Sequence, residues 1–203
     1  MTLTIVESRA YPLGLANIDT DVIIGSDWLK TVSKTGLGAG VFGALRENRR
    51  TVFDDPVFSG AEILVAGANF GCGSSREHAA WALADFGIRV VIAPSFSDIF
   101  ASNAFKNGIL AAQVDEEALP PLMEAAHAGP ITVNLIEQTI TTAESTQWRF
   151  DIEPFRRECL IEGLNEIGLT LGDEEFIAAH EQQAGEHAPW LMTVENRRTI
   201  RNG

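Results

Sequence analysis

Cysteine is scarce in this chain of 203 residues, which contains only Cys72 and Cys159, far apart in the sequence. No CxxC pair occurs, and the four histidines show no spacing that is typical of metal ligands. An iron–sulfur cluster needs several cysteine thiolates. The chain alone therefore cannot supply the ligands of such a cluster, and we expect no metal site and no cofactor within it.

Long hydrophobic runs are also absent. No apolar segment approaches the roughly 20 residues that span a bilayer. The first residues, 1–7, lack a basic region followed by a long apolar core. We therefore expect neither a signal peptide nor a membrane span, and we interpret the chain as cytoplasmic and reduced.

Basic residues are few: the chain has 15 lysines and arginines and 28 acidic residues, which gives a net charge of −13. Such a chain is repelled by phosphate backbones and anionic membrane surfaces, which argues against nucleic-acid and membrane partners. An anionic substrate would need a local basic site that overcomes this field. An arginine inside a motif is therefore of particular interest.

The rest of the composition is that of a globular protein, with 45% hydrophobic and 21% charged residues. The length suffices for one large domain with a sizeable core. We predict a single domain over residues 1–203. Its C-terminal tail, over 185–203, is charged and is expected to be mobile or to fold only against a partner.

A strand–loop–helix–strand unit lies in the middle of the chain. The short apolar runs over 63–66 and 89–93 are bounded by breakers and predict buried strands. Between them, apolar residues recur at helical spacing from Ser75 to Phe86, and Gly87 ends the helix. Such crossovers build parallel sheets, so the pattern predicts an α/β fold.

Further elements follow this unit. The sequence predicts helices over 97–106, 116–127, 153–162 and 172–183, and strands over 109–112, 131–135, 139–141 and 147–150. The last three strands alternate in polarity and form a small antiparallel element.

The glycine-rich loop over 67–75 follows a predicted strand and opens a predicted helix. Glycines let the backbone approach a ligand closely, and free N–H groups at a helix start attract anions. The loop suits phosphate or carboxylate. It lacks the Lys-Ser/Thr ending of a P-loop and the third glycine of a dinucleotide-binding fingerprint.

The residues after this loop allow two interpretations. Ser74 and Glu77 fit a capping box, and local sequence favours capping over catalysis for Ser74. Arg76 opposes the helix dipole at a cost of roughly 0.3–1 kcal/mol, which makes sense if its guanidinium forks onto an anionic carboxylate. His78 is interpreted as a packed or hydrogen-bonded residue rather than a base, and Cys72 as an ordinary loop cysteine.

Two other charged pairs stand out. Asp19 and Asp21 have no further clustered ligands, so the pair is expected to satisfy turn and backbone donors rather than bind a metal. Arg156 and Arg157 either reach substrate or a partner, or lie on a solvated helix face.

Several blocks in order along the chain resemble the small subunit of 3-isopropylmalate dehydratase, a family related to the last domain of aconitase. The blocks are Asn69–Ala79 (NFGCGSSREHA), Ser95–Phe100 with Asn103, Asn17–Ile24 (NIDTDVII), and Phe155–Arg157 with Gly163–Leu164 and Ile167–Leu171. The resemblance covers nearly the whole chain.

The resemblance implies a swivelling β/β/α domain of the aconitase C-terminal type, with a mostly parallel sheet flanked by helices. It implies a separate large subunit with a [4Fe–4S] cluster, whose open iron binds the hydroxyl and a carboxylate of a malate-type substrate. The two subunits together would interconvert 2-isopropylmalate and 3-isopropylmalate in leucine biosynthesis, by dehydration and rehydration. By position, Ser74 would move the carbon-bound proton, and Ser75 and Arg76 would hold a substrate carboxylate.

The segment after the first block is expected to select the substituent on the malate. Trp28 and Leu29 would line an apolar pocket for the isopropyl group, and Lys30 would grip a further carboxylate. Alternatively, Trp28 merely packs a short helix.

Two alternative functions remain at this point. One is a stand-alone anion- or nucleotide-binding module built on the same loop. The other is a paralogous hydratase for citraconate, a methylated malate or homoaconitate, because a pocket distinguishes one methylene by only roughly 1–3 kcal/mol.

Overall fold

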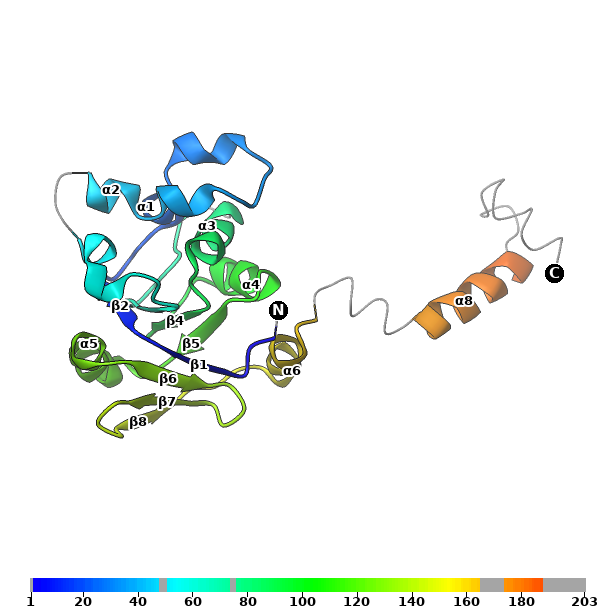
Figure 1. Ribbon diagram of the computed structural model, residues 1–203. Helices are drawn as coiled ribbons and strands as arrows, with labels where there is room; N and C mark the ends of the chain where they lie inside the picture. The colour runs from blue at the N-terminus through cyan, green and yellow to red at the C-terminus, as the bar shows by residue number, and fades with distance from the viewer. Residues whose placement is uncertain (1, 48–50, 74–75, 165–173, 188–203) are drawn as a thin grey trace. The chain divides into compact units, whose positions relative to one another are not determined.

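The computed structural model describes residues 2–47, 51–73, 76–164 and 174–187. The chain divides into two compact units, Met1–Gly163 and Leu164–Gly203. The first contains both β-sheets (Figure 1). In the second, helix α8 (Glu174–His187) covers most of the helix predicted over 172–183. The predicted tail beyond His187 lies outside the described residues. Among the helices described, none is long and apolar enough to cross a membrane.

A four-stranded parallel sheet with the order β2-β3-β4-β5 forms the centre of the first unit. Its strands are β2 (Ala10–Pro12), β3 (Ile63–Val65), β4 (Val90–Ala93) and β5 (Leu110–Gln113). Every residue of β3 and β4 is buried, because the sheet is covered on both faces, and their sequences are accordingly apolar throughout. The predicted strands and their parallel pairing are confirmed. Strand β2 is absent from the prediction.

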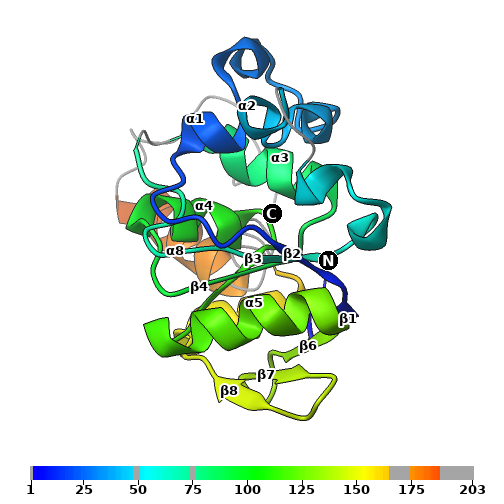
Figure 2. The same cartoon turned by 90° about the vertical axis from the view of Figure 1, so that its left-hand side faces the viewer.

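Helices cover the two faces of this sheet (Figures 1 and 2). Helices α3 (His78–Phe86) and α4 (Asp98–Lys106) lie on one face. Helix α5 (Leu119–Ala128), preceded by the 3-10 turn η5 (Glu116–Ala118), lies on the other. Alternate strand residues point to opposite faces of the sheet. Leu64 and Val91 therefore pack in one core with α3 and α4. The residues on either side of them, Ile63, Val65, Val90 and Ile92, pack in a second core with α5.

A second sheet is entirely antiparallel, with the order β1-β6-β7-β8. Its buried hydrophobic residues pack in the same core as those of α5. Its strands are β1 (Ile5–Ser8), β6 (Ile131–Asn134), β7 (Thr139–Thr142) and β8 (Gln147–Arg149). The predicted antiparallel element is confirmed. Strand β1, which pairs with β6, is missing from the prediction.

Helix α6 (Pro154–Glu162) follows this sheet, as predicted. The Glu153 carboxylate caps it by accepting two backbone N–H groups of the first turn. The Arg157 guanidinium donates to the carbonyls of Leu135 and Ile136 at 3.0 and 2.6 Å. Arg157 therefore ties α6 to the turn after β6.

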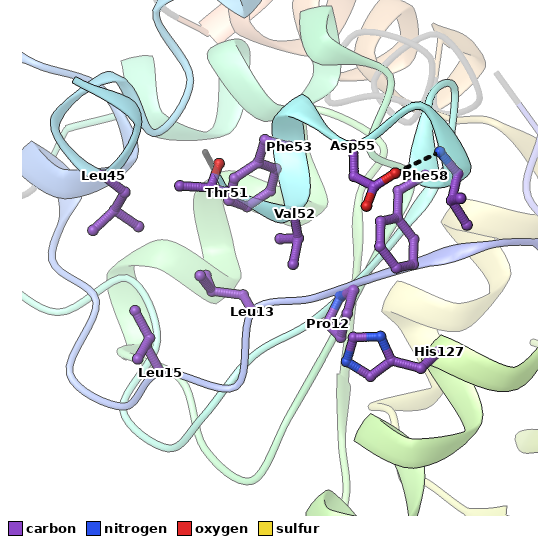
Figure 3. Close-up of a pocket in the computed structure, with 11 residues that line it drawn as sticks. Pro12, Leu13, Leu15, Leu45, Thr51, Val52, Phe53, Asp55, Phe58 and His127 are labelled. Atoms are coloured by element: carbon purple, nitrogen blue, oxygen red, sulfur yellow. Dashed lines mark hydrogen bonds between the residues drawn. The ribbon is translucent and has the colours of Figure 1, made fainter. Parts of the chain in front are cut away.

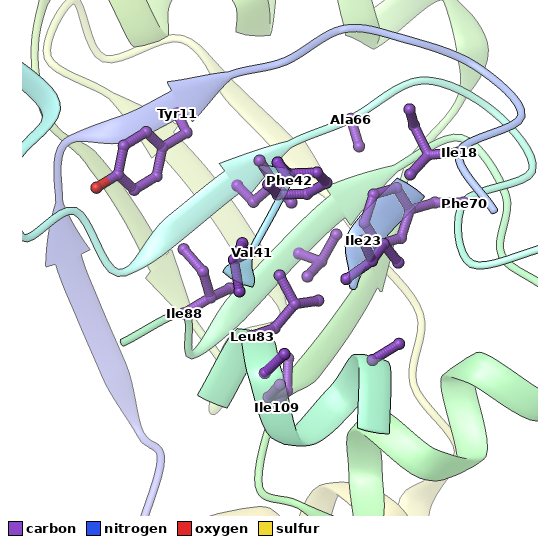
Figure 4. Packing of buried hydrophobic residues seen from close by; sticks show 14 of the residues in the cluster. Tyr11, Ile18, Ile23, Val41, Phe42, Ala66, Phe70, Leu83, Ile88 and Ile109 are labelled. Carbon is purple, nitrogen blue, oxygen red and sulfur yellow. The ribbon is translucent and has the colours of Figure 1, made fainter. Parts of the chain in front are cut away.

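Short helices fill the long connection between β2 and β3. They are α1 (Thr20–Ile23), η1 (Ser26–Lys30), η2 (Leu37–Gly40), α2 (Gly43–Arg46), η3 (Val52–Asp54) and η4 (Pro56–Phe58). Their buried side chains join the core of α3, and Figure 4 shows Ile23 and Phe42 among them. The rings of Phe42 and Phe53 stack with centroids 4.4 Å apart. Hydrophobic periodicity predicts none of these helices, because each is too short for it to register.

Candidate functional site

The segments that follow β2, β3 and β4 meet at one edge of the parallel sheet, because the carboxyl ends of parallel strands lie together. The glycine loop after β3 is held between the other two. On one side, the N–H groups of Gly71 and Cys72 donate to the Ile18 carbonyl at 2.8 and 3.2 Å. On the other, the N–H of Phe70 donates to the Ser95 carbonyl at 3.0 Å.

Hydrogen bonds from two further side chains fix the loop. The Ser97 hydroxyl donates to the Gly71 carbonyl at 2.7 Å and accepts from the Phe100 N–H at 3.2 Å, so one residue caps α4 and holds the loop. The side-chain amide of Asn69 donates to Asn17 at 2.9 Å. The loop is therefore pre-organised on both flanks, a role that the sequence analysis does not assign to Ser97.

Gly71 occupies a position that only glycine fits. Its φ is +73°, in the left-handed region. A Cβ there would lie 2.2 Å from Cγ of Phe100, well inside van der Waals contact. The loop thus runs directly over the Phe100 ring, which is buried in the core of α3.

The two serines of the predicted site, Ser74 and Ser75, lie outside the described residues. Helix α3 begins at His78, so the predicted start at Ser75 is wrong. Glu77 stands at the N-cap position, and its carboxylate accepts from the Asn107 amide at 3.1 Å. This hydrogen bond lowers the pKa of Glu77, so the carboxylate stays ionised.

Arg76 forms an ion pair with Asp21 of α1, across 55 positions of sequence separation. Both side chains are partly exposed. The pair joins two of the blocks noted in the sequence, and it explains how a cation is tolerated at the start of α3, since an adjacent carboxylate offsets the helix dipole. Arg76 is predicted from the sequence to bind an anion, whereas Asp21 is not predicted to be its partner.

The other aspartate of that block has a local role. The Asp19 carboxylate accepts the Val22 N–H at 2.8 Å and caps α1. It therefore satisfies a backbone donor, as expected. The two carboxylates are divided between a cap and an ion pair.

His78 is a hydrogen-bonded and packed residue, as predicted. Its Nε2 donates to the Thr31 carbonyl at 3.0 Å. Its ring centroid lies 4.6 Å from that of Trp81. His78 thus connects α3 to the segment that follows η1.

Trp28 and Leu29, predicted to face the malate substituent, and Lys30, predicted to bind a further carboxylate, lie on η1 and differ in their surroundings. Trp28 is 39% exposed and packs against η2, where a Cβ on Gly40 would come within 2.5 Å of the indole. Leu29 is half-buried against the core of α3. Lys30 is exposed. Of these three residues, Trp28 and Lys30 are therefore exposed and Leu29 is not.

A groove of about 700 Å³ lies beside β2 (Figure 3). Its walls are mostly apolar and include Leu13, Phe53 and Phe58, with His127 at one side. None of the predicted site residues lines it. Neither Arg76 nor a residue of the glycine loop contributes to its walls.

Within the part of the chain that the structure describes, no group of three His, Cys, Asp or Glu side chains is placed to hold a metal ion. Cys159 is buried in α6, whereas Cys72 is half-buried in the glycine loop. Burial and the nearby Glu158 raise the pKa of the Cys159 thiol. These residues do not fit the ligand set of an iron–sulfur cluster.

Two family models match the sequence. The aconitase C-terminal domain matches residues 2–117, and the C-terminal domain of the 3-isopropylmalate dehydratase small subunit matches residues 166–193. The first match contains the glycine loop, Arg76 and Asp21. It is consistent with the α/β architecture described above.

Proteins of known description are similar over nearly the full length. A 3-isopropylmalate dehydratase small subunit from Erythrobacter litoralis is 53% identical over 195 residues, which cover 96% of this chain and 98% of the relative. The corresponding subunit from Novosphingobium aromaticivorans is 53% identical over 186 residues, 92% of each chain. The crystal structure of a 3-isopropylmalate dehydratase from Methanocaldococcus jannaschii is 28% identical, with a TM-score of 0.68 over 87% of this chain and 99% of that one. The expected aconitase-like fold class is confirmed.

Proposed function

Since this chain belongs to the family of 3-isopropylmalate dehydratase small subunits, we propose that it is the substrate-gripping half of a two-subunit hydro-lyase. The complete enzyme interconverts 2-isopropylmalate and 3-isopropylmalate in leucine biosynthesis. The similar relatives favour this function over a paralogous hydratase and over a stand-alone anion- or nucleotide-binding module.

The ion pair between Arg76 and Asp21 is the observation that best supports the proposal. It holds a guanidinium beside a pre-organised glycine loop, and this group matches the geometry of a carboxylate. A guanidinium has five N–H donors in a planar fork, so the Asp21 carboxylate leaves donors free for a substrate carboxylate.

The site is completed by a partner in this proposal. The chain's own residues do not fit a cluster, so the [4Fe–4S] cluster is assigned to the large subunit, where its open iron supplies the Lewis acid that lets hydroxide leave. This chain contributes the groups that hold the substrate and move its proton.

Ser74 is proposed to carry the proton. It removes a proton from the carbon next to the hydroxyl-bearing carbon as hydroxide departs, which leaves an unsaturated isopropyl-substituted intermediate. Return of the proton and of water with exchanged positions gives the isomer. A serine hydroxyl is a weak base unless its alkoxide is stabilised, and loop N–H groups together with the Arg76 cation are suited to that task.

Ser75 and Arg76 are proposed to hold a substrate carboxylate. Trp28 and Leu29 are proposed to contact the isopropyl group, and Lys30 to approach a further carboxylate. The exposed indole of Trp28 and the exposed Lys30 are consistent with such contacts.

We further propose that residues 1–203 act as one swivelling domain in the cytoplasm, with the large subunit and a small malate-type substrate as partners and neither nucleic acid nor membrane among them. The strongly negative net charge supports the last two exclusions. Turnover of 2-isopropylmalate by the two subunits together, measured without oxygen, is the experiment that tests the function.

Replacement of Arg76 by lysine tests whether Arg76 binds a carboxylate of the substrate. Lysine keeps the charge but loses the fork that binds a carboxylate through two parallel hydrogen bonds. We expect kcat/KM for 2-isopropylmalate to fall about thirtyfold, mainly through KM, since one charged hydrogen bond contributes about 1.5–3 kcal/mol. Steady-state kinetics of the assembled enzyme measure this change.

Arg89→Lys is the matched control. Arg89 precedes β4 at the opposite edge of the sheet and donates to the Thr2 carbonyl at 2.9 Å. We expect its KM to equal that of the unchanged enzyme. Equal KM values for the Arg76 and Arg89 variants would remove Arg76 from the site.

A further inference from the structure

Glu77 and His78, which directly follow Arg76, have no role in the proposed chemistry, yet both side chains form specific hydrogen bonds. His78 Nε2 donates to the Thr31 carbonyl at 3.0 Å. A carbonyl only accepts, so this ring nitrogen carries a proton. The contact joins the first turn of α3 to the peptide that directly follows η1.

A second set of contacts involves Lys34 of the same segment after η1. Lys34 Nζ donates to Asn107 Oδ1 at 3.1 Å, and Asn107 Nδ2 donates to Glu77 Oε1 at 3.1 Å. The Lys34 ammonium also lies 5.0 Å from the Trp81 ring centroid. That ring in turn lies 4.6 Å from His78. We call these six residues the clasp: Thr31, Lys34, Glu77, His78, Trp81 and Asn107.

The clasp holds one end of the segment that carries η1, and α1 holds the other. Asp21 of α1 pairs with Arg76, and Ile24 forms a β-bridge with Val41. Both ends of the segment are therefore tied to the start of α3 or to its immediate neighbours. Trp28 stands between the two anchors and also packs against η2, so the clasp is one of the contacts that place it.

Val32 shows that the core does not hold this segment after η1. Its side chain is 96% exposed, although it directly follows Thr31. Polar contacts of Thr31 and Lys34 therefore hold the residues that directly follow η1. Loss of such a contact would loosen the C-terminal end of η1, and with it the placement of Trp28, without removing the ion pair of Arg76.

We infer that His78 is a positioning residue that sets the selectivity of the enzyme for the malate substituent, through its hydrogen bond to Thr31. The inference rests on the proposed function. A pocket distinguishes substrates that differ by a methylene by about 1–3 kcal/mol, and only if its wall stays in place. Displacement of the wall should therefore weaken the preference for a large substituent and leave a small one almost unaffected.

The test compares two substrates in the complex with the unchanged large subunit. His78→Phe keeps a ring against Trp81 and removes the donor, whereas His78→Gln places an amide donor near the former Nε2. We expect the ratio of kcat/KM for 2-isopropylmalate over 2-methylmalate to fall about fivefold in His78→Phe and to return in His78→Gln, as the loss of one neutral hydrogen bond predicts. His127→Phe, on α5 and beside the separate groove, should keep the original ratio.

Hydrogen–deuterium exchange gives a readout that does not need activity. Backbone amides over 31–35 should exchange about fivefold faster in His78→Phe than in His78→Gln. If His78→Phe does not fold, Lys34→Met tests the clasp from its exposed side, and the ratio should then fall about threefold.

Three results would overturn the inference. Unchanged kcat/KM values for both substrates in His78→Phe would remove His78 from selectivity, and an equal fall for both substrates would reduce it to a stabilising residue. Absence of 2-isopropylmalate turnover by the unchanged complex would overturn the proposed function, and the selectivity inference with it. In that case, faster amide exchange over 31–35 in His78→Phe would still show that the clasp holds this segment.

Discussion

Replacement of Ser74 by alanine is expected to lower kcat of the assembled enzyme about a thousandfold, because a positioned proton-transfer group contributes about 10²–10⁴ to the rate. The large subunit should still bind, since only one hydroxyl is removed. Steady-state turnover of 2-isopropylmalate measures kcat, and size-exclusion chromatography measures assembly. Solvent deuterium should also no longer enter the substrate at the exchanging carbon.

Ser75→Ala is the neighbouring control. Ser75 is proposed to bind a carboxylate, so its replacement should raise KM more than it lowers kcat. A Ser74→Ala enzyme with full activity would restrict Ser74 to the structural role of a helix cap.

Replacement of Gly71 by alanine is expected to reduce the free energy of unfolding by about 3 kcal/mol. The added Cβ would meet the Phe100 ring at 2.2 Å, and the φ of +73° is strained for any residue with a Cβ. Since Phe100 belongs to the core of α3, the clash cannot be relieved by moving a surface side chain. Urea unfolding of the subunit measures the loss.

Gly60→Ala separates the two contributions. Gly60 has a similar φ of +76°, but nothing lies within 4 Å of an added Cβ. We expect a loss of about 1 kcal/mol there, from backbone strain alone. Equal losses at the two glycines would show that the loop does not press on Phe100.

The centre of the fold is predictable from sequence because its strands are buried on both faces. Strands β3 and β4 are continuous apolar runs, and a helix that ends at a left-handed glycine lies between them. Their burial, order and parallel pairing follow from that pattern alone.

Shorter elements carry no such pattern. Strands β1 and β2 have four and three residues, and their pairing with β6 and β3 depends on partners far along the chain. The predicted start of α3 at Ser75 lies outside the described residues, and the described helix begins at His78.

The candidate site is likewise predictable from the sequence only in part. Arg76 stands out in the sequence because a cation opposes the helix dipole. Its partner Asp21 does not stand out, since only the fold brings the two together. Likewise, nothing in the sequence indicates that His78 reaches the Thr31 carbonyl or that Arg157 binds the turn after β6.

The most direct test of the proposed function is turnover of 2-isopropylmalate by this chain, combined without oxygen with a cluster-loaded large subunit from the same organism. The ultraviolet absorbance of the unsaturated intermediate follows the reaction, with citraconate and homoaconitate as competing substrates. We predict activity only in the mixture, and highest activity on isopropylmalate. A formed complex with an intact cluster that turns over none of these substrates would contradict the assignment of this chain as half of the active site.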